Sequence, residues 1–181
     1  MRINAGERRG RRLEAPPGRA TRPTSDRARE GLFSMLQSRL GVFDGLHAAD
    51  LFAGTGALGL EALSRGAAYC TFVERDRTAI DILKRNVQHL GAGDRADIRP
   101  QAAEYAAPPR VPCDLIMMDP PYGTDLAQAT LDHIAASRWL APGGWISVEM
   151  HGETLTLPQE LKAAGERRFG KATVLLLHAS V

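Results

Sequence analysis

Short apolar runs alternate with longer amphipathic stretches along most of this chain. The short runs are typical of buried strands, and the longer stretches have apolar residues at helical spacing. The predicted strands are 46–52, 70–74, 96–100, 114–118 and 144–150. The predicted helices are 28–40, 57–65, 77–90 and 125–138, and Thr24 or Ser25 could cap the first of them. This alternation predicts an α/β fold with a mostly parallel sheet and helices on both of its faces.

Both ends of the chain depart from this alternation. Glycines and prolines among the first residues predict a short hairpin or an extended arm rather than a helix. We therefore divide the chain into a basic arm, 1–20, and a body, 21–181. Towards the C-terminus, 161–164 is predicted to close a short helix, and 167–169 is predicted to pair antiparallel with 173–178.

Two acidic residues stand where predicted helices begin. Asp76 precedes the helix that starts at residue 77, where its side chain can cap the first turn. Asp125 is followed three residues later by Gln128, which is the spacing of a capping box. Capping, rather than ligand binding, is the role that we predict for Asp76.

The length and composition fit one folded domain. The chain has 181 residues, 44% of them hydrophobic, which is enough for one hydrophobic core. No apolar run approaches the ~20 residues that span a bilayer, and no apolar segment follows the basic N-terminal residues as in a secretory signal. Cys70 and Cys113 lie far apart in apolar surroundings, which predicts buried thiols. The histidines form no cluster, so we expect no metal, and we expect a cytoplasmic monomer.

Basic residues gather at the start of the chain. Residues 1–40 contain ten arginines against four acidic residues, whereas the remainder has 13 basic and 17 acidic residues. Such a segment is typical of an arm that binds a polyanion, and the forked guanidinium of arginine favours phosphate. A solvated surface or a charged, flexible tail has the same composition. The arm residues that we expect to contact a polyanion are Arg8, Arg9, Arg11 and Arg12.

A glycine-rich loop joins the first strand of the body to the helix that follows it. Gly54, Gly56 and Gly59 match the pattern G-x-G-x-x-G, in which bare main chain lets a ligand approach closely. Glu74 follows the second strand, 20 residues after Gly54, where a carboxylate can accept hydrogen bonds from ribose hydroxyls. This pattern fits a dinucleotide or S-adenosylmethionine, and it also fits a glycine-rich turn without a ligand.

Two observations favour S-adenosylmethionine. Asp50 stands at the end of the first strand, where it could face a cationic amino-acid group, and the later loop described next has no role in hydride transfer. Gln101 and Ala102 follow the third strand, where an adenine ring lies in this architecture. The candidate cofactor-binding residues are Asp50, Phe52, Ala53, Gly54, Gly56, Glu74, Arg75, Gln101 and Ala102.

A second loop, Asp119-Pro120-Pro121-Tyr122, follows a buried strand. The amino group of a base is a poor nucleophile because its lone pair is delocalised into the ring. The carboxylate of Asp119 and the rigid carbonyl of Pro120 can accept hydrogen bonds from the two N–H groups of this amine. Tyr122 can stack on the base. The alternative is a Pro-Pro turn with an incidental acid and aromatic, but the glycine loop beside it favours catalysis by these four residues.

Four segments resemble one known family. They are RPTSDRARE (22–30), DLFAGTGALGLEALSRGA (50–67), VERD (73–76) and DPPY (119–122). Together they resemble the RsmD family, bacterial methyltransferases that form N2-methylguanine at guanine 966 of 16S ribosomal RNA. The glycine loop and DPPY occur in many methyltransferases, whereas RPTSDRARE and LGLEALSRGA point to this family.

The resemblance implies a Rossmann-like class I methyltransferase fold, with a seven-stranded sheet whose last strand is antiparallel. It implies that S-adenosylmethionine is the cofactor, held by the glycine loop and Glu74, and that residues 119–122 hold a guanine. The segment around Arg22 and Arg27 would close over the cofactor and touch RNA. The implied partner is ribosomal RNA, within the small subunit or an assembly intermediate.

Three other functions share parts of this pattern. A DNA methyltransferase acting on adenine N6 or cytosine N4 also uses a Pro-Pro-aromatic loop, but it usually needs a target-recognition domain for which this chain has no room. In a nicotinamide-dependent oxidoreductase, the Asp119-Pro120-Pro121-Tyr122 loop would have no role. A non-catalytic RNA-binding protein would have no need of an intact set of site residues.

Overall fold

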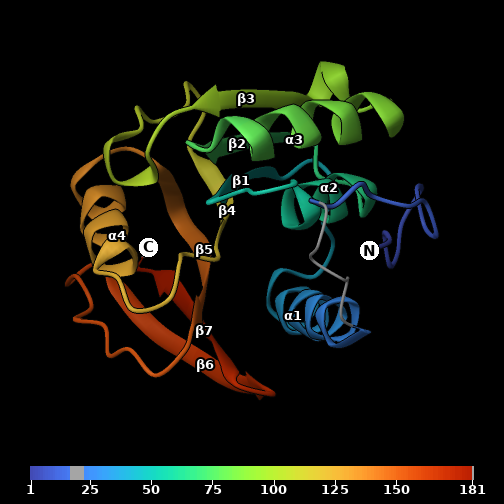
Figure 1. Cartoon of the computed structure of the whole chain (residues 1–181). Helices are drawn as coiled ribbons and strands as arrows, with labels where there is room; N and C mark the ends of the chain where they lie inside the picture. The colour runs from blue at the N-terminus through green and yellow to red at the C-terminus, as the bar shows by residue number, and fades with distance from the viewer. Residues whose placement is uncertain (17–22, 181) are drawn as a thin grey trace.

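The computed structural model describes residues 1–16 and 23–180 and is built on one sheet of seven strands (Figure 1). The strands are β1 (His47–Leu51), β2 (Tyr69–Glu74), β3 (Ala96–Pro100), β4 (Cys113–Met118), β5 (Leu140–Met150), β6 (Leu161–Phe169) and β7 (Ala172–Ala179). Their order across the sheet is β3-β2-β1-β4-β5-β7-β6. The first five run parallel, whereas β7 pairs antiparallel with both β5 and β6. The predicted mostly parallel sheet with an antiparallel last strand is confirmed.

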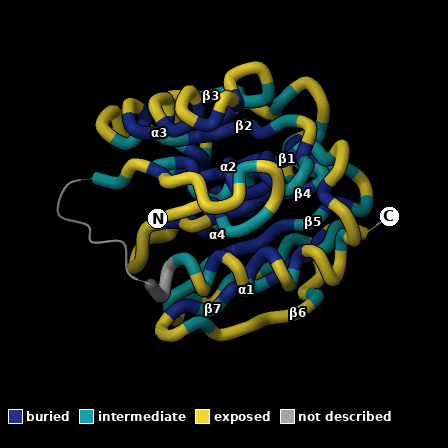
Figure 2. Tube along the Cα trace, turned by 90° about the vertical axis from the view of Figure 1, so that its right-hand side faces the viewer, coloured by how far each residue is buried: buried dark blue, intermediate teal, exposed yellow. Residues whose placement is uncertain are grey.

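Helices cover both faces of this sheet, as predicted. They are α1 (Pro23–Leu40), α2 (Ala57–Ser64), α3 (Arg77–His89) and α4 (Leu126–Ala136). Apolar residues of α1, α2 and α3 pack in one core with alternate residues of the strands, and those of α4 pack in a second core with the others. On β1, Ala48 belongs to the first core and Ala49 to the second. Strands covered on both faces are buried throughout, which explains their continuous apolar runs (Figure 2).

The N-terminal residues form a short hairpin. Arg2 pairs with Arg12 across it, and the N–H of Ile3 donates to the carbonyl of Arg11 at 3.0 Å. Ile3 and Leu13 enter the first core and are only 1% and 6% exposed. Residues 1–13 are therefore packed on the body of the protein and do not form a free tail.

A buried carboxylate ties this hairpin to two helices. Glu61 on α2 is fully buried and accepts hydrogen bonds from the backbone N–H groups of Asn4 and Ala5, at 2.8 and 3.1 Å. It also accepts a hydrogen bond from Nε of Arg65 at 2.8 Å, and Nε of Arg29 on α1 lies 3.6 Å away. Because a buried charge is costly unless it is paired, these partners must stay in place together.

We expect Glu61→Gln to destabilise the protein by about 1–3 kcal/mol, because it removes the charge that Arg29 and Arg65 face and turns one acceptor into a donor. The free energy of unfolding in urea measures this loss. Glu166→Gln, an exposed carboxylate on β6, is the matched control. Equal stability of the two variants would contradict the role assigned to Glu61.

One predicted element was wrong. Residues 161–164 are not the end of a helix but the start of strand β6, which pairs with β7 from Leu161 opposite Ala179 to Phe169 opposite Ala172. The predicted antiparallel pair of 167–169 with 173–178 is confirmed and extends further. Ladder hydrogen bonds to β7 outweigh the local helical preference of Leu-Lys-Ala-Ala, because strand formation depends on the partner more than on intrinsic propensity.

The predicted helix caps had different outcomes. Helix α1 begins at Pro23 rather than at residue 28, so Thr24 and Ser25 lie inside the helix and the predicted cap was wrong. The side chain of Asp76 accepts a hydrogen bond from the N–H of Ala79 at 2.8 Å, so its capping role is confirmed. Asp125 precedes α4 but its side chain makes no capping hydrogen bond, so the capping box was wrong. Gln128 instead bonds the backbone of Thr156 twice, donating to its carbonyl at 2.9 Å and accepting from its N–H at 2.8 Å. The side chain thus fixes the segment after β5 instead of the start of α4.

No helix in the described ranges is long and apolar enough to cross a membrane. Both cysteines are buried and free, as predicted.

Candidate functional site

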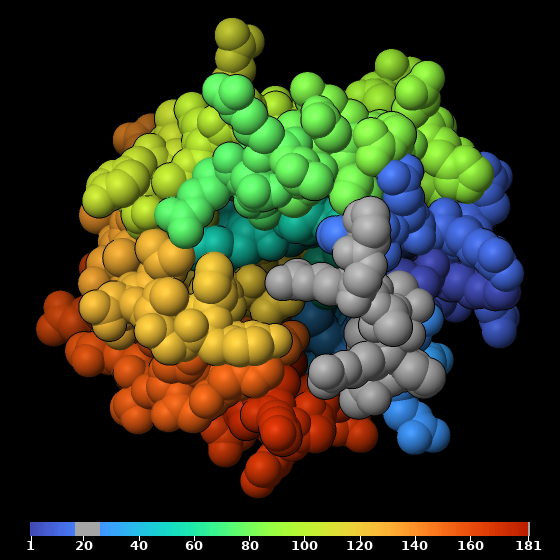
Figure 3. Space-filling view, in the orientation of Figure 1, coloured from blue at the N-terminus to red at the C-terminus, as the bar shows by residue number. Residues whose placement is uncertain are grey.

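Four carboxylates gather at the edge of the sheet where the parallel strands β1, β2, β4 and β5 end. Asp50 and Glu74 lie at the ends of β1 and β2, Asp119 directly follows β4, and Glu149 is next to last in β5. Open α/β sheets bind their ligands at the carboxyl ends of parallel strands. Figure 3 shows a recess here, between the green surface that follows β2 and the gold surface that follows β4, with teal residues near the end of β1 at its floor.

The glycine loop presents one open position and two packed ones. A Cβ added at Gly56 would lie 2.3 Å from Leu83, and one at Gly59 would lie 2.3 Å from Phe72, so both glycines allow close packing of α2 on the protein. A Cβ at Gly54 would meet nothing within 4 Å. The main chain at Gly54 therefore faces open space, which is where a ligand can approach it.

The backbone is strained just before this loop. Phe52 has φ of 70°, the one positive φ among the described residues other than glycine. The N–H groups of Phe52 and Ala53 both donate to the carbonyl of Val73, at 3.1 and 3.0 Å. Such strain persists where the surroundings impose it, and it is frequent at ligand sites. Phe52 and Ala53 thus shape the turn that leads into the glycine loop.

Asp50 lies beneath the loop rather than in the recess. Its side chain is buried, with 1% of the residue exposed, and Oδ2 accepts a hydrogen bond from the N–H of Gly59 at 2.8 Å. Burial raises the pKa of Asp50 to about 8, and the negative charges of Asp119 and Glu74 add to the rise, while the bond from Gly59 opposes it. The structure therefore makes Asp50 an anchor of the loop, whereas the sequence suggested direct contact with a cationic group.

Glu74 links the ends of two strands and stays partly accessible. Its Oε2 accepts a hydrogen bond from the N–H of Gly54 at 2.8 Å, and its Oε1 accepts from the N–H groups of Arg75 and Asp76, both at 2.8 Å. These bonds hold the carboxylate beside the open position of the glycine loop. Gln101 and Ala102 follow β3, and they are exposed and half-buried.

The Asp119-Pro120-Pro121-Tyr122 loop stands at the same edge, after β4. Pro120 is buried, whereas Asp119 and Pro121 are exposed. The carbonyl of Pro121 accepts a hydrogen bond from the hydroxyl of Thr124 at 2.8 Å, which tightens the turn. Tyr122 is 67% exposed, and its ring lies 3.8 Å from the ring of His151, centre to centre. The loop thus offers an accessible carboxylate and a partly free aromatic surface.

The surroundings of Asp119 raise its pKa. The main cause is the desolvation of the carboxylate by surrounding protein atoms, and the second cause is the negative charge of Glu149. The residue is nevertheless exposed, so water solvates the carboxylate and limits the rise.

The sequence did not single out Glu149 or His151. Nε2 of His151 lies 3.2 Å from Oε1 of Glu149, so the two side chains form a pair beside Tyr122. An acid in the mostly apolar run Trp-Ile-Ser-Val-Glu-Met is the signal that could have pointed to Glu149. In residues 1–16 and 23–180, no group of three or more His, Cys, Asp or Glu side chains is placed to hold a metal ion.

The predicted arginines of the hairpin fall into two groups. Nε of Arg8 donates to the carbonyl of Leu90 at 2.6 Å, and Nη2 of Arg11 donates to the carbonyl of His89 at 2.8 Å. These two guanidinium groups are therefore engaged at the C-terminal end of α3. The residues Arg9, Arg12 and Arg27 are exposed, and Arg22 lies outside the described residues.

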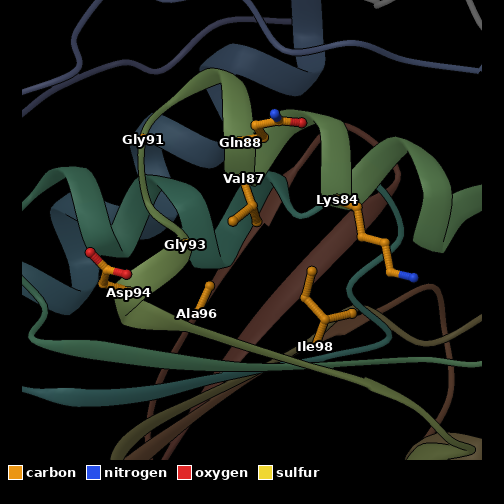
Figure 4. A pocket seen from close by; sticks show the side chains of 8 residues that line it. All are labelled: Lys84, Val87, Gln88, Gly91, Gly93, Asp94, Ala96 and Ile98. Carbon is orange, nitrogen blue, oxygen red and sulfur yellow. The ribbon is translucent and has the colours of Figure 1, made fainter.

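Two hollows lie elsewhere on the protein. One of about 520 Å³ lies between α3 and β3, with Lys84 and Asp94 at opposite ends of a mostly aliphatic lining (Figure 4). The other, of about 430 Å³, includes Asp97, Arg99 and Arg110. Neither contains the four carboxylates or the two loops, so the strand-end recess is the candidate functional site.

Comparison with known proteins agrees with this architecture. The chain matches the family described as "Conserved hypothetical protein 95" over residues 1–178. YlbH of Bacillus subtilis is 38% identical over 163 residues, 88% of this chain and 86% of YlbH. Ribosomal RNA small subunit methyltransferase D of Escherichia coli strain K12 is 39% identical over 153 residues, 84% of this chain and 76% of the relative. The solved structure of yhhF from Escherichia coli has a TM-score of 0.87 at 33% identity and covers 100% of this chain and 98% of that chain.

The fold is that of the Rossmann-like methyltransferases. Within this class, the chain belongs to the RsmD family, whose description is "Conserved hypothetical protein 95". The resemblance carried by the four sequence segments is confirmed.

Proposed function

We propose that this protein transfers a methyl group from S-adenosylmethionine to the N2 amine of a guanine in 16S ribosomal RNA. The observation that carries the proposal is the position of the accessible Asp119-Pro120-Pro121-Tyr122 loop, which shares one edge of the sheet with the open glycine loop. The name of the Escherichia coli relative, Ribosomal RNA small subunit methyltransferase D, supports the choice of substrate.

The residues at this edge fit S-adenosylmethionine. The open space at Gly54 admits a ligand against bare main chain, and Glu74 beside it offers a carboxylate to ribose hydroxyls. The carboxylates of Glu74 and Glu149 at the strand ends produce a negative field that suits a sulfonium and an ammonium group. Gln101 and Ala102 are the proposed adenine contacts, and Phe52, Ala53, Gly56 and Arg75 complete the lining. When bound, the cofactor supplies an activated methyl group on a positively charged sulfur.

The second loop fits the base. The carboxylate of Asp119 and the carbonyl of Pro120 accept hydrogen bonds from the two N–H groups of the exocyclic amine. These hydrogen bonds favour a pyramidal nitrogen with an available lone pair. Tyr122 stacks on the base and aligns the amine with the methyl group. The amine loses a proton once the methyl is attached, and Asp119 is the group placed to receive it.

The substrate class follows from the relative's name and from the hairpin. Arg9, Arg12 and Arg27 are exposed and can meet phosphates, whereas Arg8 and Arg11 donate to carbonyls at the end of α3. Arg22 joins this proposal from the sequence alone. We propose that a single copy of the protein acts in the cytoplasm on the small subunit or an assembly intermediate.

The test is transfer of tritium from labelled S-adenosylmethionine to small subunits that lack the modification, with naked 16S ribosomal RNA and genomic DNA beside them. Mass spectrometry of the labelled nucleoside identifies the product. N2-methylguanine from subunits or RNA is the expected result. Methyladenine or methylcytosine from DNA would overturn the base and the substrate, and tight cofactor binding without any transfer would favour a non-catalytic RNA-binding protein.

We expect the double variant Arg9→Ala/Arg12→Ala to bind RNA with a weaker salt dependence. Each phosphate contact that is lost lowers the slope of log K against log[salt] by about 1, so the slope should fall by about 2. Binding titrations between low and moderate salt measure the slope. Arg138→Ala, an exposed arginine after α4, serves as the control. An unchanged slope in the double variant would remove these two residues from the RNA surface.

A further inference from the structure

Glu149 lies beside the proposed catalytic carboxylate on the neighbouring strand. Met118 at the end of β4 pairs with Val148 of β5, so the next residues along the two parallel strands are Asp119 and Glu149. Val148 packs in the core under α4, and strand alternation therefore turns Glu149 to the other face of the sheet. The two carboxylates are close enough for the negative charge of Glu149 to raise the pKa of Asp119, after the larger effect of burial.

Glu149 is also connected to the aromatic ring that the base would stack on. Its Oε1 lies 3.2 Å from Nε2 of His151, and the ring of His151 lies 3.8 Å from that of Tyr122. The pairing with His151 engages one carboxylate oxygen, and an ionised carboxylate has a second oxygen that accepts hydrogen bonds. A base stacked on Tyr122 would thus meet Asp119 and Glu149 along one edge.

The chemistry of base edges distinguishes guanine at such a site. The Watson–Crick edge of guanine has two neighbouring donor groups, the N1–H and the N2 amine. Adenine and cytosine each place an acceptor nitrogen next to their amine. Two adjacent carboxylates only accept when ionised, so they complement guanine and repel the ring nitrogen lone pair of the other two bases.

We propose that Glu149 determines base specificity by accepting the N1–H of the guanine whose N2 amine is held by Asp119. His151 is a positioning residue that fixes Glu149 between the base edge and the stacking ring. This assignment rests on the proposed function. It adds a residue that recognises the base to the residues that hold the reacting amine.

The test compares two bases and two enzymes. Small subunits are reconstituted with 16S ribosomal RNA that carries either guanine or 2-aminopurine at the methylated position. 2-Aminopurine keeps the N2 amine but has an acceptor at N1. We expect kcat/KM of the wild-type protein to fall by about 10- to 100-fold on 2-aminopurine, the range for a lost hydrogen bond to a charged group. Glu149→Gln should lower this preference for guanine at least tenfold, because its amide can donate to N1.

The ratio of kcat/KM on guanine to kcat/KM on 2-aminopurine distinguishes a loss of base recognition from damage to the fold. A purely structural loss would lower both values equally and leave the ratio unchanged, and that outcome in Glu149→Gln would overturn the proposal. Equal use of both bases by the wild-type protein would overturn it as well. Glu166→Gln, an exposed change on β6, should keep the wild-type ratio. Absence of wild-type transfer to guanine itself would refute the proposed function, and this inference with it.

Discussion

Replacement of Asp119 by alanine should reduce methyl transfer by about 10²- to 10⁴-fold, while the affinity for S-adenosylmethionine changes little. The carboxylate is exposed after β4, where it can touch the amine of the base. Gly54 and Glu74, the residues proposed to hold the cofactor, lie after β1 and at the end of β2. Single-turnover transfer to unmodified small subunits measures the first quantity, and calorimetric titration with the cofactor measures the second.

Asp125→Ala is the matched control for this experiment. Asp125 is an exposed acid a few residues further along the same loop, and its side chain makes no capping hydrogen bond to α4. Its replacement removes one negative charge near the recess without touching the proposed contact to the base, so transfer should stay near the wild-type rate. Equal losses in Asp119→Ala and Asp125→Ala would mean that charge near the recess, and not contact with the amine, governs transfer.

The elements that the sequence predicted well are those whose local pattern and final environment agree. Strand β3 (Ala96–Pro100) has the predicted bounds, β2 and β4 each begin one residue earlier than predicted, and β1 is one residue shorter than predicted at both ends. β1, β2 and β4 are mostly apolar runs, and burial on both faces demands that pattern, whereas the half-buried β3 is a short mixed run bounded by turn residues. Strand β6 lies at the edge of the sheet and is mostly exposed, so no apolar alternation marks it. Only the pairing of 167–169 with β7 was predicted, and the pairing from Leu161 onwards had to be seen in the structure.

The residues of the candidate site also divide into those that the sequence predicted and those that only the structure brings together. The glycine loop and the Asp119 loop are contiguous in sequence, so their residue types and spacing were enough to find them. Glu149 and His151 reach the site because β5 lies next to β4, a neighbourhood that spacing along the chain does not contain. The anchoring of the hairpin by Glu61 joins residues more than 50 positions apart, and an acid inside a helix is ordinarily read as a solvated one.

Asp50 was found by the sequence, but its role was not. The carboxylate lies four residues before Gly54 and was expected to face a ligand. The fold instead turns it under the loop, where it accepts the N–H of Gly59. Since Gly59 packs against Phe72, this bond sets the position of the start of α2, and through it the open position at Gly54. The structure thus gives Asp50 a role in positioning the glycine loop.

Burial of Asp50 predicts a stability that depends on pH. Its pKa is raised from an ordinary value of 3.8 to about 8 in the folded protein, by burial first and by Asp119 and Glu74 second. Between these two values the folded protein holds a proton on Asp50 that the unfolded chain has lost, so the contribution of Asp50 to stability falls as pH rises through this window and stays constant above it. The slope approaches about 1.4 kcal/mol for each pH unit.

Asp50→Asn should remove this dependence, because asparagine keeps an oxygen for the N–H of Gly59 and does not titrate. Its free energy of unfolding in urea, relative to wild type, should therefore increase by about 4 kcal/mol from pH 5 to pH 8. Asp81→Asn, an exposed position on α3, should follow the wild-type curve. Parallel curves for Asp50→Asn and wild type would mean that Asp50 stays ionised in the folded protein, and that the carboxylates at the strand ends keep their full negative charge before any cationic ligand binds.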